Sequence, residues 1–177
     1  MKNININGHD IISENCYDSV KVNGQAFCTS SFKASNIKVS GQLNSQYDIN
    51  CDKVVINGSI TANDLSVGYL TLNGDIVCRS LSGDTIVLNI TGKSNVGEIK
   101  CNKLIICDKS INAPNNHIVE LKVTKIDCNE IFAEKLICEE VKCADFTGLN
   151  GTVINTLYYR NSKDIKDNVV IKQIIKV

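Results

Sequence analysis

Cysteine and histidine are the residues of this sequence that could ligate a metal ion or act as a nucleophile or base, and the chain has nine cysteines and two histidines. A structural zinc site needs thiolates or imidazoles at ligand spacing, yet no C-x-x-C pair occurs. His9 and His117 lie far apart and have no recognisable catalytic partner, so we expect both at surface corners. No phosphate-binding or hydrolase motif is present. The sequence therefore predicts no catalytic residue, no metal site and no cofactor, and the protein is expected not to be an enzyme.

Most of the cysteines stand at positions that alanine fills elsewhere in the chain, which indicates small core residues. These cysteines are Cys51, Cys78, Cys101, Cys128, Cys138 and Cys143, and the alanines are Ala34, Ala62 and Ala133. Cys16 and Cys107 fit this pattern less well, so we expect them to be the exposed thiols. The odd number of cysteines argues against a disulfide framework.

An internal repeat predicts the elements that hold these residues. Five segments read apolar-x-apolar-x-Gly, and their glycines follow one another after 16 or 17 residues, at Gly8, Gly24, Gly41, Gly58 and Gly74. Between these segments lie further pairs of apolar or small residues separated by one residue, such as Ile60 with Ala62 and Leu65 with Val67. Each pair places two side chains on one face of a short strand, and the polar residues that follow suit a corner.

Three strands and three corners in each cycle describe a triangular coil of about 15–18 residues. Strands this short need partners above and below, so the coils must stack and merge their inward side chains into one core. We therefore predict an all-β, single-domain parallel β-helix, or β-solenoid, over residues 1–150. The predicted core includes Ile56, Leu65, Leu72, Leu81, Leu104, Ile131 and Leu136, and the predicted outer residues are Thr61, Ser66 and Thr71.

The repeat becomes strict late in the chain and then stops. Apolar residues recur every five positions at Leu121, Ile126, Ile131, Leu136, Val141 and Phe146. After Gly151 this spacing is lost, although the alternation over residues 169–177 favours a strand over a helix. We interpret residues 151–177 as a C-terminal cap or arm, because the open end of a solenoid needs a cover.

An antiparallel fold is the alternative. Asn-Gly between apolar runs is a strong signal for a β-hairpin, and it occurs at Asn7-Gly8, Asn23-Gly24, Asn57-Gly58 and Asn73-Gly74. A meander or sandwich of hairpins does not explain why the units between these turns repeat as well.

Charge excludes some partners. The formal net charge is zero, so no global field attracts nucleic acid or an anionic membrane, and membrane association is not indicated. Residues 1–15 lack the continuous apolar stretch of a secretory signal, and we expect a cytoplasmic protein. Charge is uneven along the chain: Arg160 and four lysines outweigh two aspartates in residues 150–177, whereas residues 127–146 are acidic.

The units of the form V-x-I-x-G-x-I-x-A-x-x-L-x-V are clearest in residues 54–67 and 70–81. Through them the chain resembles the bactofilins, the polymer-forming β-helical cytoskeletal proteins of bacteria, over roughly residues 4–149. The resemblance implies a right-handed, three-sided β-helix that polymerises end to end without nucleotide and serves as a scaffold. The five-residue spacing is also similar to that of pentapeptide-repeat proteins, although only Ala144-Asp145-Phe146 follows their usual order.

Self-assembly through the two ends is the predicted function, because each terminal coil offers unpaired backbone groups and open core. The candidate contacts are Ile4 and Ile6 at one end and Phe146, Leu149, Leu157 and Tyr158 at the other. The predicted partner is thus the protein itself, together with any proteins that it scaffolds. The alternative is a monomeric solenoid that binds another protein, as pentapeptide-repeat proteins do.

Overall fold

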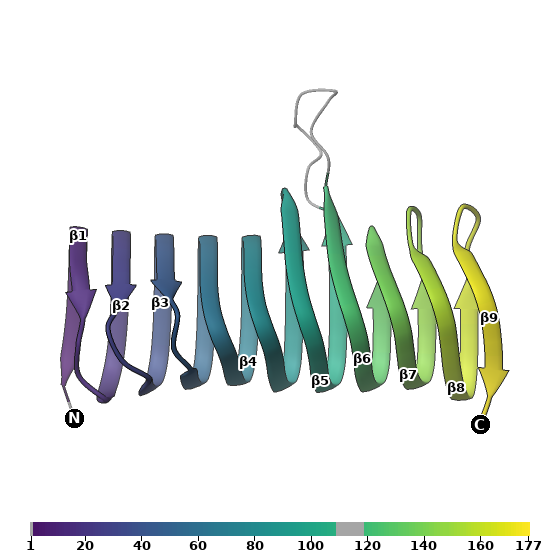
Figure 1. The fold of residues 1–177 in the computed structure, drawn as a ribbon, viewed down its shortest axis with the longest axis horizontal. Helices are drawn as coiled ribbons and strands as arrows, with labels where there is room; N and C mark the ends of the chain where they lie inside the picture. Colours follow the sequence, from purple (N-terminus) through teal and green to yellow (C-terminus); the bar gives the residue numbers. More distant parts are fainter. Residues whose placement is uncertain (1, 109–118) are drawn as a thin grey trace.

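The computed structural model describes residues 2–108 and 119–177, which form one parallel sheet of nine strands wound into a solenoid of about ten coils (Figure 1). The predicted fold class is therefore confirmed. The strands are β1 (Asn3–Ile12), β2 (Cys16–Cys28), β3 (Phe32–Ser45), β4 (Ile49–Ile90), β5 (Lys93–Asp108), β6 (Glu120–Ala133), β7 (Leu136–Gly148), β8 (Val153–Ile165) and β9 (Val170–Lys176). The two termini lie at opposite ends of the stack (Figure 1). No helix of the length and apolarity that a membrane span requires occurs in these described ranges.

Each coil has three sides, which we number from the coil that contains Gly58. Side 1 holds residues 54–56, side 2 holds residues 60–62 and side 3 holds residues 65–67. Every strand pairs in parallel with the next one along the chain, so each residue stacks on its equivalent one coil later, as Val20 stacks on Ile37 and Ile37 on Val54. Residues that share a position thus form columns along the stack.

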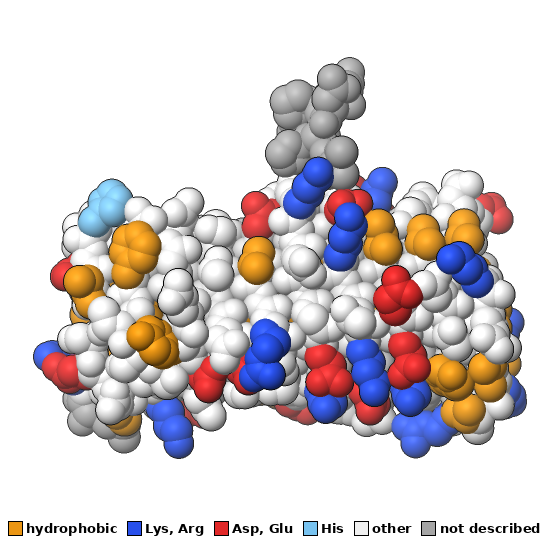
Figure 2. Space-filling view, viewed as in Figure 1, with side chains coloured by type: hydrophobic (Ala, Val, Ile, Leu, Met, Phe, Trp, Pro, Cys, Tyr) orange, Lys and Arg blue, Asp and Glu red, His pale blue; other side chains and the backbone are white. Residues whose placement is uncertain are grey.

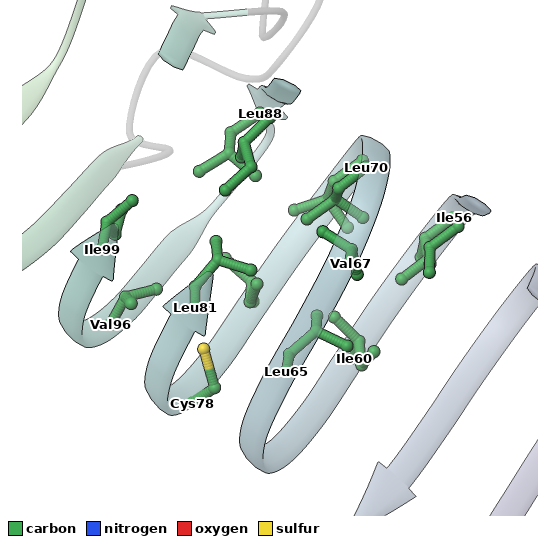
Figure 3. Close-up of a cluster of buried hydrophobic side chains, with 14 of the residues drawn as sticks. Ile56, Ile60, Leu65, Val67, Leu70, Cys78, Leu81, Leu88, Val96 and Ile99 are labelled. Carbon is green, nitrogen blue, oxygen red and sulfur yellow. The ribbon is translucent and has the colours of Figure 1, made fainter. Parts of the chain in front are cut away.

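The core consists of the inward columns of all three sides. All seven predicted core residues are buried, whereas Thr61, Ser66 and Thr71 are not. Ile60 and Leu65, from neighbouring sides of one coil, point toward each other, and Cys78 points into the same interior (Figure 3). Isoleucine, leucine and valine suit this interior because β-branched and branched aliphatic side chains fill a narrow space between short strands.

Glycine is required where side 1 turns into side 2. Gly8, Gly24, Gly41, Gly58 and Gly74 stack in one column with positive φ angles. A Cβ atom on Gly58 would lie 2.0 Å from the carbonyl oxygen of Gly41 in the coil before. The corner therefore excludes every other residue type, both by its backbone conformation and by the close approach of the coils.

The Asn-Gly pairs belong to these corners and form no hairpins, so the antiparallel alternative is wrong. The asparagines stack like the glycines, and their amides bond along the column. Asn73 donates a hydrogen bond to the side-chain oxygen of Asn57 at 2.8 Å, and Asn89 donates one to Asn73 at 2.8 Å. The asparagine that signals a turn in sequence is here part of a ladder between coils.

The solenoid continues past residue 150, although the sequence predicts that it ends there. β8 pairs in parallel with β7, and β9 pairs in parallel with β8, so residues 151–177 form the last strands of the same sheet. The strand predicted near the C-terminus is present as β9. The register shifts between Cys143 and Asp145, which indicates a β-bulge at this point of the β7–β8 pairing. This irregularity interrupts the five-residue spacing without interrupting the stack.

Candidate assembly interface

The two ends of the solenoid differ from its sides because their outer strands have a partner on one edge only. β1 pairs with β2 alone, and β9 pairs with β8 alone. The outer edges of β1 and β9 therefore present N–H and C=O groups in the spacing that another parallel strand would need. What the ends can bind depends on the side chains that surround these edges.

The N-terminal end is covered by polar contacts and one large aromatic ring. The Tyr17 hydroxyl accepts a hydrogen bond from the Glu14 amide at 2.9 Å, and its ring packs edge-on against Phe32 at 5.8 Å between centroids. Lys2 forms an ion pair with Glu14, which raises the pKa of the lysine through the hydrogen bond and the negative charge. Of the predicted contacts here, Ile6 is buried and Ile4 is half-buried against the core.

The C-terminal end is open and apolar. Ile174 stacks on Leu157 in the inward column of side 3, yet Ile174 is 41% exposed whereas Leu157 is 0% exposed. The difference arises because β9 is the last of the described strands, and no other described strand stacks on its inward residue. Ile171, which stacks on the buried Ile154, is partly buried against the core at the same end, and Val177 is exposed there. This end thus presents a cross-section of the core to the surroundings.

The predicted C-terminal contacts need correction, because the last strands cover two of them. Phe146 is 1% exposed beneath Lys163, and Leu157 is buried beneath Ile174, so neither can reach another molecule. Leu149 is half-buried, and Tyr158 lies half-exposed on side 3 with the Lys142 ammonium 5.3 Å from its ring centroid. The residues that form the C-terminal surface are instead Ile171, Ile174 and Val177.

Charge differs in sign between the ends. In residues 2–18, Asp10, Glu14 and Asp18 outnumber Lys2, the single lysine of that segment. Residues 160–177 contain five basic residues against two aspartates. An acidic N-terminal end and a basic C-terminal end attract each other, and this attraction acts over about 8–10 Å at physiological ionic strength.

Burial sets the pKa of most of the cysteine thiols. As predicted, Cys51, Cys78, Cys128, Cys138 and Cys143 are buried and Cys16 is exposed; Cys28, which the alanine pattern did not reveal, is buried too. Cys101, predicted in the core, is partly exposed. Cys107, predicted to be an exposed thiol, is partly exposed as well. Loss of solvation raises the pKa of Cys28 and Cys51 to about 11, and that of Cys78, Cys138 and Cys143 to about 12.

Three cysteines follow one another along one column of side 3. Cys101 pairs with Cys128 in register, and Cys143 follows in the next coil. A hydrogen bond with the Cys101 thiol, together with burial, raises the pKa of Cys128 far above its ordinary range. At neutral pH Cys128 and Cys143 are therefore protonated, and they act as small apolar side chains rather than as ligands or nucleophiles.

The described residues contain no cluster of three or more His, Cys, Asp or Glu side chains that could hold a metal ion. His9 is exposed at a corner, whereas His117 lies outside the described residues.

No family model, curated protein or solved structure matches the chain.

Proposed function

We propose that this protein is a self-assembling scaffold whose solenoids stack end to end into filaments without nucleotide, as the resemblance to bactofilins implies. One observation carries the proposal: the inward-facing Ile174 is 41% exposed at the C-terminal end. A core position left open on the last strand is completed when another coil stacks on it.

Stacking supplies the same interactions that join neighbouring coils within the chain. It buries the apolar side chains of Ile171, Ile174 and Val177, at about 25 cal/mol for each Å² removed from water. It also pairs the free edges of β9 and of the neighbouring molecule. Both gains require a partner of the same strand spacing, which favours a second copy of this chain over an unrelated protein.

Charge favours a head-to-tail arrangement. The acidic residues of the N-terminal end face the basic residues of the C-terminal end when the solenoids point in the same direction. Such a heterologous contact does not close on itself and generates a filament when each subunit repeats it. At about 4.8 Å per coil, the roughly ten coils of one subunit predict an axial repeat of about 48 Å.

The test replaces Ile174 by glutamate. The substitution places a negative charge on the open core, so it should abolish filaments while the circular dichroism spectrum of the solenoid is retained. Tyr69→Glu is the matched control, because Tyr69 is 57% exposed at a corner between sides 3 and 1, away from both ends. Sedimentation velocity and negative-stain microscopy at tens of micromolar protein measure the outcome. Filaments of Ile174→Glu as long as those of the control would refute the end contact.

A monomeric binding module is the second candidate. It is favoured by a hollow on side 1 that Ile105, Ile131 and Phe132 line, with Lys103 and Glu130 at its rim. If the wild-type protein sediments as a monomer at tens of micromolar and shows no filaments, this candidate replaces the scaffold.

A further inference from the structure

One outward column of the solenoid is unusually apolar. It runs along side 2 through the position of Thr61, where every side chain points away from the core. Of its ten residues, Ile11, Phe27, Val77, Ile137, Val153 and Val170 are apolar, and Asn44, Thr61, Asn95 and Lys122 are polar. We call these ten residues the side 2 column.

The apolar members of the side 2 column are accessible to solvent. Ile11 is 53% exposed and Val170 is 54% exposed, and Phe27 and Val77 are nearly as open. The space-filling view shows apolar side chains along the upper part of the visible face, at both ends of the stack (Figure 2). Outward positions of a soluble sheet are ordinarily polar, and an exposed apolar stripe of this length marks an interaction surface.

We propose that side 2 is a lateral interface at which two copies of this chain pack face to face, with their solenoid axes antiparallel. A two-fold axis through the middle of the column places Ile11 of one copy opposite Val170 of the other. The same axis places Phe27 opposite Val153. The apolar residues at the two ends of the column thus cover each other.

Charge selects the antiparallel orientation over the parallel one. Lys122 is the single charged member of the side 2 column, all ten of whose residues the structure describes. The antiparallel arrangement places Lys122 opposite the neutral Thr61, whereas a parallel arrangement would place it against Lys122 of the other copy. At the adjoining corner Glu120 stacks on Lys93 and forms an ion pair with Lys122 at 3.3 Å, so the surroundings are mixed in charge and do not attract an anionic membrane.

The area suits a pair of identical chains. The column is about 48 Å long at about 4.8 Å per coil, and one strand of side chains is roughly 10–15 Å wide. The contact therefore buries on the order of 500–700 Å² per copy, close to the roughly 800 Å² of a standard interface. This contact does not depend on the ends, and it would exist whether or not the ends assemble.

The first test measures association when the ends are blocked. In the Ile174→Glu background we expect a monomer–dimer equilibrium at tens of micromolar. Phe27→Glu combined with Val153→Glu should weaken it by at least tenfold, because two carboxylates then lie on each side of the contact. Tyr69→Glu in the same background is the control and should leave association unchanged. Sedimentation equilibrium gives the dissociation constants. If filaments persist, the width of the filaments is compared between the doubly charged variant and the Tyr69→Glu control.

The lateral contact would be overturned if the Ile174→Glu variant stayed monomeric up to 200 µM and the wild-type filaments were one subunit wide. Equal association of the Tyr69→Glu control and the doubly charged variant would overturn it too. Loss of association in both of these variants would assign the effect to charge in general and would also count against side 2. Failure of the end contact alone leaves lateral dimers in the wild type, so the two proposals fail separately.

The second test determines the orientation by crosslinking. In a Cys16→Ser background, which removes the exposed native thiol, Phe27→Cys and Val153→Cys are made as separate proteins. A short bis-maleimide should join the two only when they are mixed, and the Cys16→Ser parent should give no product. Efficient crosslinking of Phe27→Cys to itself would show the parallel arrangement and refute the antiparallel one.

Discussion

Replacing Gly58 by alanine tests the stacking of the coils at the corner between sides 1 and 2. The φ angle of Gly58 is +138°, and the new Cβ atom would lie 2.0 Å from the Gly41 carbonyl oxygen, where ordinary contact begins at 3.4 Å. The two coils must therefore separate locally by about 1 Å or more. Backbone strain at such a φ costs about 1–3 kcal/mol. Overpacking costs about 1–3 kcal/mol, and one or two lost hydrogen bonds between coils cost about 1 kcal/mol each. We expect the free energy of unfolding to fall by about 3–8 kcal/mol.

Two other glycines separate the backbone strain from the steric clash. Gly8 has a φ of +103°, but its Cβ atom would meet nothing within 4 Å, because β1 is an edge strand of the described sheet. Gly151 has a φ of +75°, and its Cβ atom would approach only the flexible side chain of Lys135. Alanine at either position should cost the strain alone, about 1–3 kcal/mol.

Urea unfolding followed by far-ultraviolet circular dichroism, at one protein concentration, gives the three free energies. Gly58→Ala should unfold at a clearly lower urea concentration than both Gly8→Ala and Gly151→Ala. A cost for Gly58→Ala within about 1 kcal/mol of both controls would mean that the corners of neighbouring coils do not approach as described, and the register of the stack would then be wrong.

Three further predictions concern the core, the thiols and one surface carboxylate. Leu72→Ala should lower the free energy of unfolding by about 2–5 kcal/mol, measured in urea, because the leucine is fully buried and a cavity remains. In native buffer at pH 8, Ellman's reagent should react rapidly with Cys16, whereas Cys78, whose pKa burial raises to about 12, should react only after unfolding. Hydrogen bonds from Ser162 and Asn161 lower the pKa of Asp145, so this group contributes stability above the ordinary pKa of an aspartate and loses it as the pH falls through the lowered value. Ser162→Ala should therefore raise the pKa of Asp145 in a carbon-detected NMR titration.

Sequence spacing was sufficient to predict the solenoid and most of its core. Inward pairs such as Leu65 and Val67, each followed by polar corner residues, recur at a regular spacing. This recurrence specifies a stack of coils, because each coil must pair with the next. The same logic placed Cys51 and Cys78 in the interior. The resemblance to bactofilins is a further prediction, and it stays one.

The C-terminal contacts could not be predicted in this way. β8 follows β7 after 16 residues, as Val153 follows Ile137, whereas β7 follows β6 after 15, as Leu136 follows Leu121. The register shifts once more between Cys143 and Asp145, so residues 151–177 do not continue the five-residue spacing and are predicted as a cap or arm. As a result Phe146 and Leu157 seemed to lie at the end of the stack, although β8 and β9 cover them. One extra residue before β8 and a second one within it account for the lost spacing, and the end of the stack lies at Ile174.

The sequence by itself determined which side chains point inward and which point outward, because the direction of a side chain follows from the two-residue period of a strand. The tertiary structure alone decided whether a given inward residue is covered. Leu157 and Ile174 are both apolar and both point inward, and they differ only because one has a coil above it and the other does not. It also decided that Ile11, Phe27 and Val170, far apart in the chain, lie in one column on one side. Both facts depend on the register between coils, which is set by hydrogen bonds and packing over the whole stack rather than by any local stretch of residues.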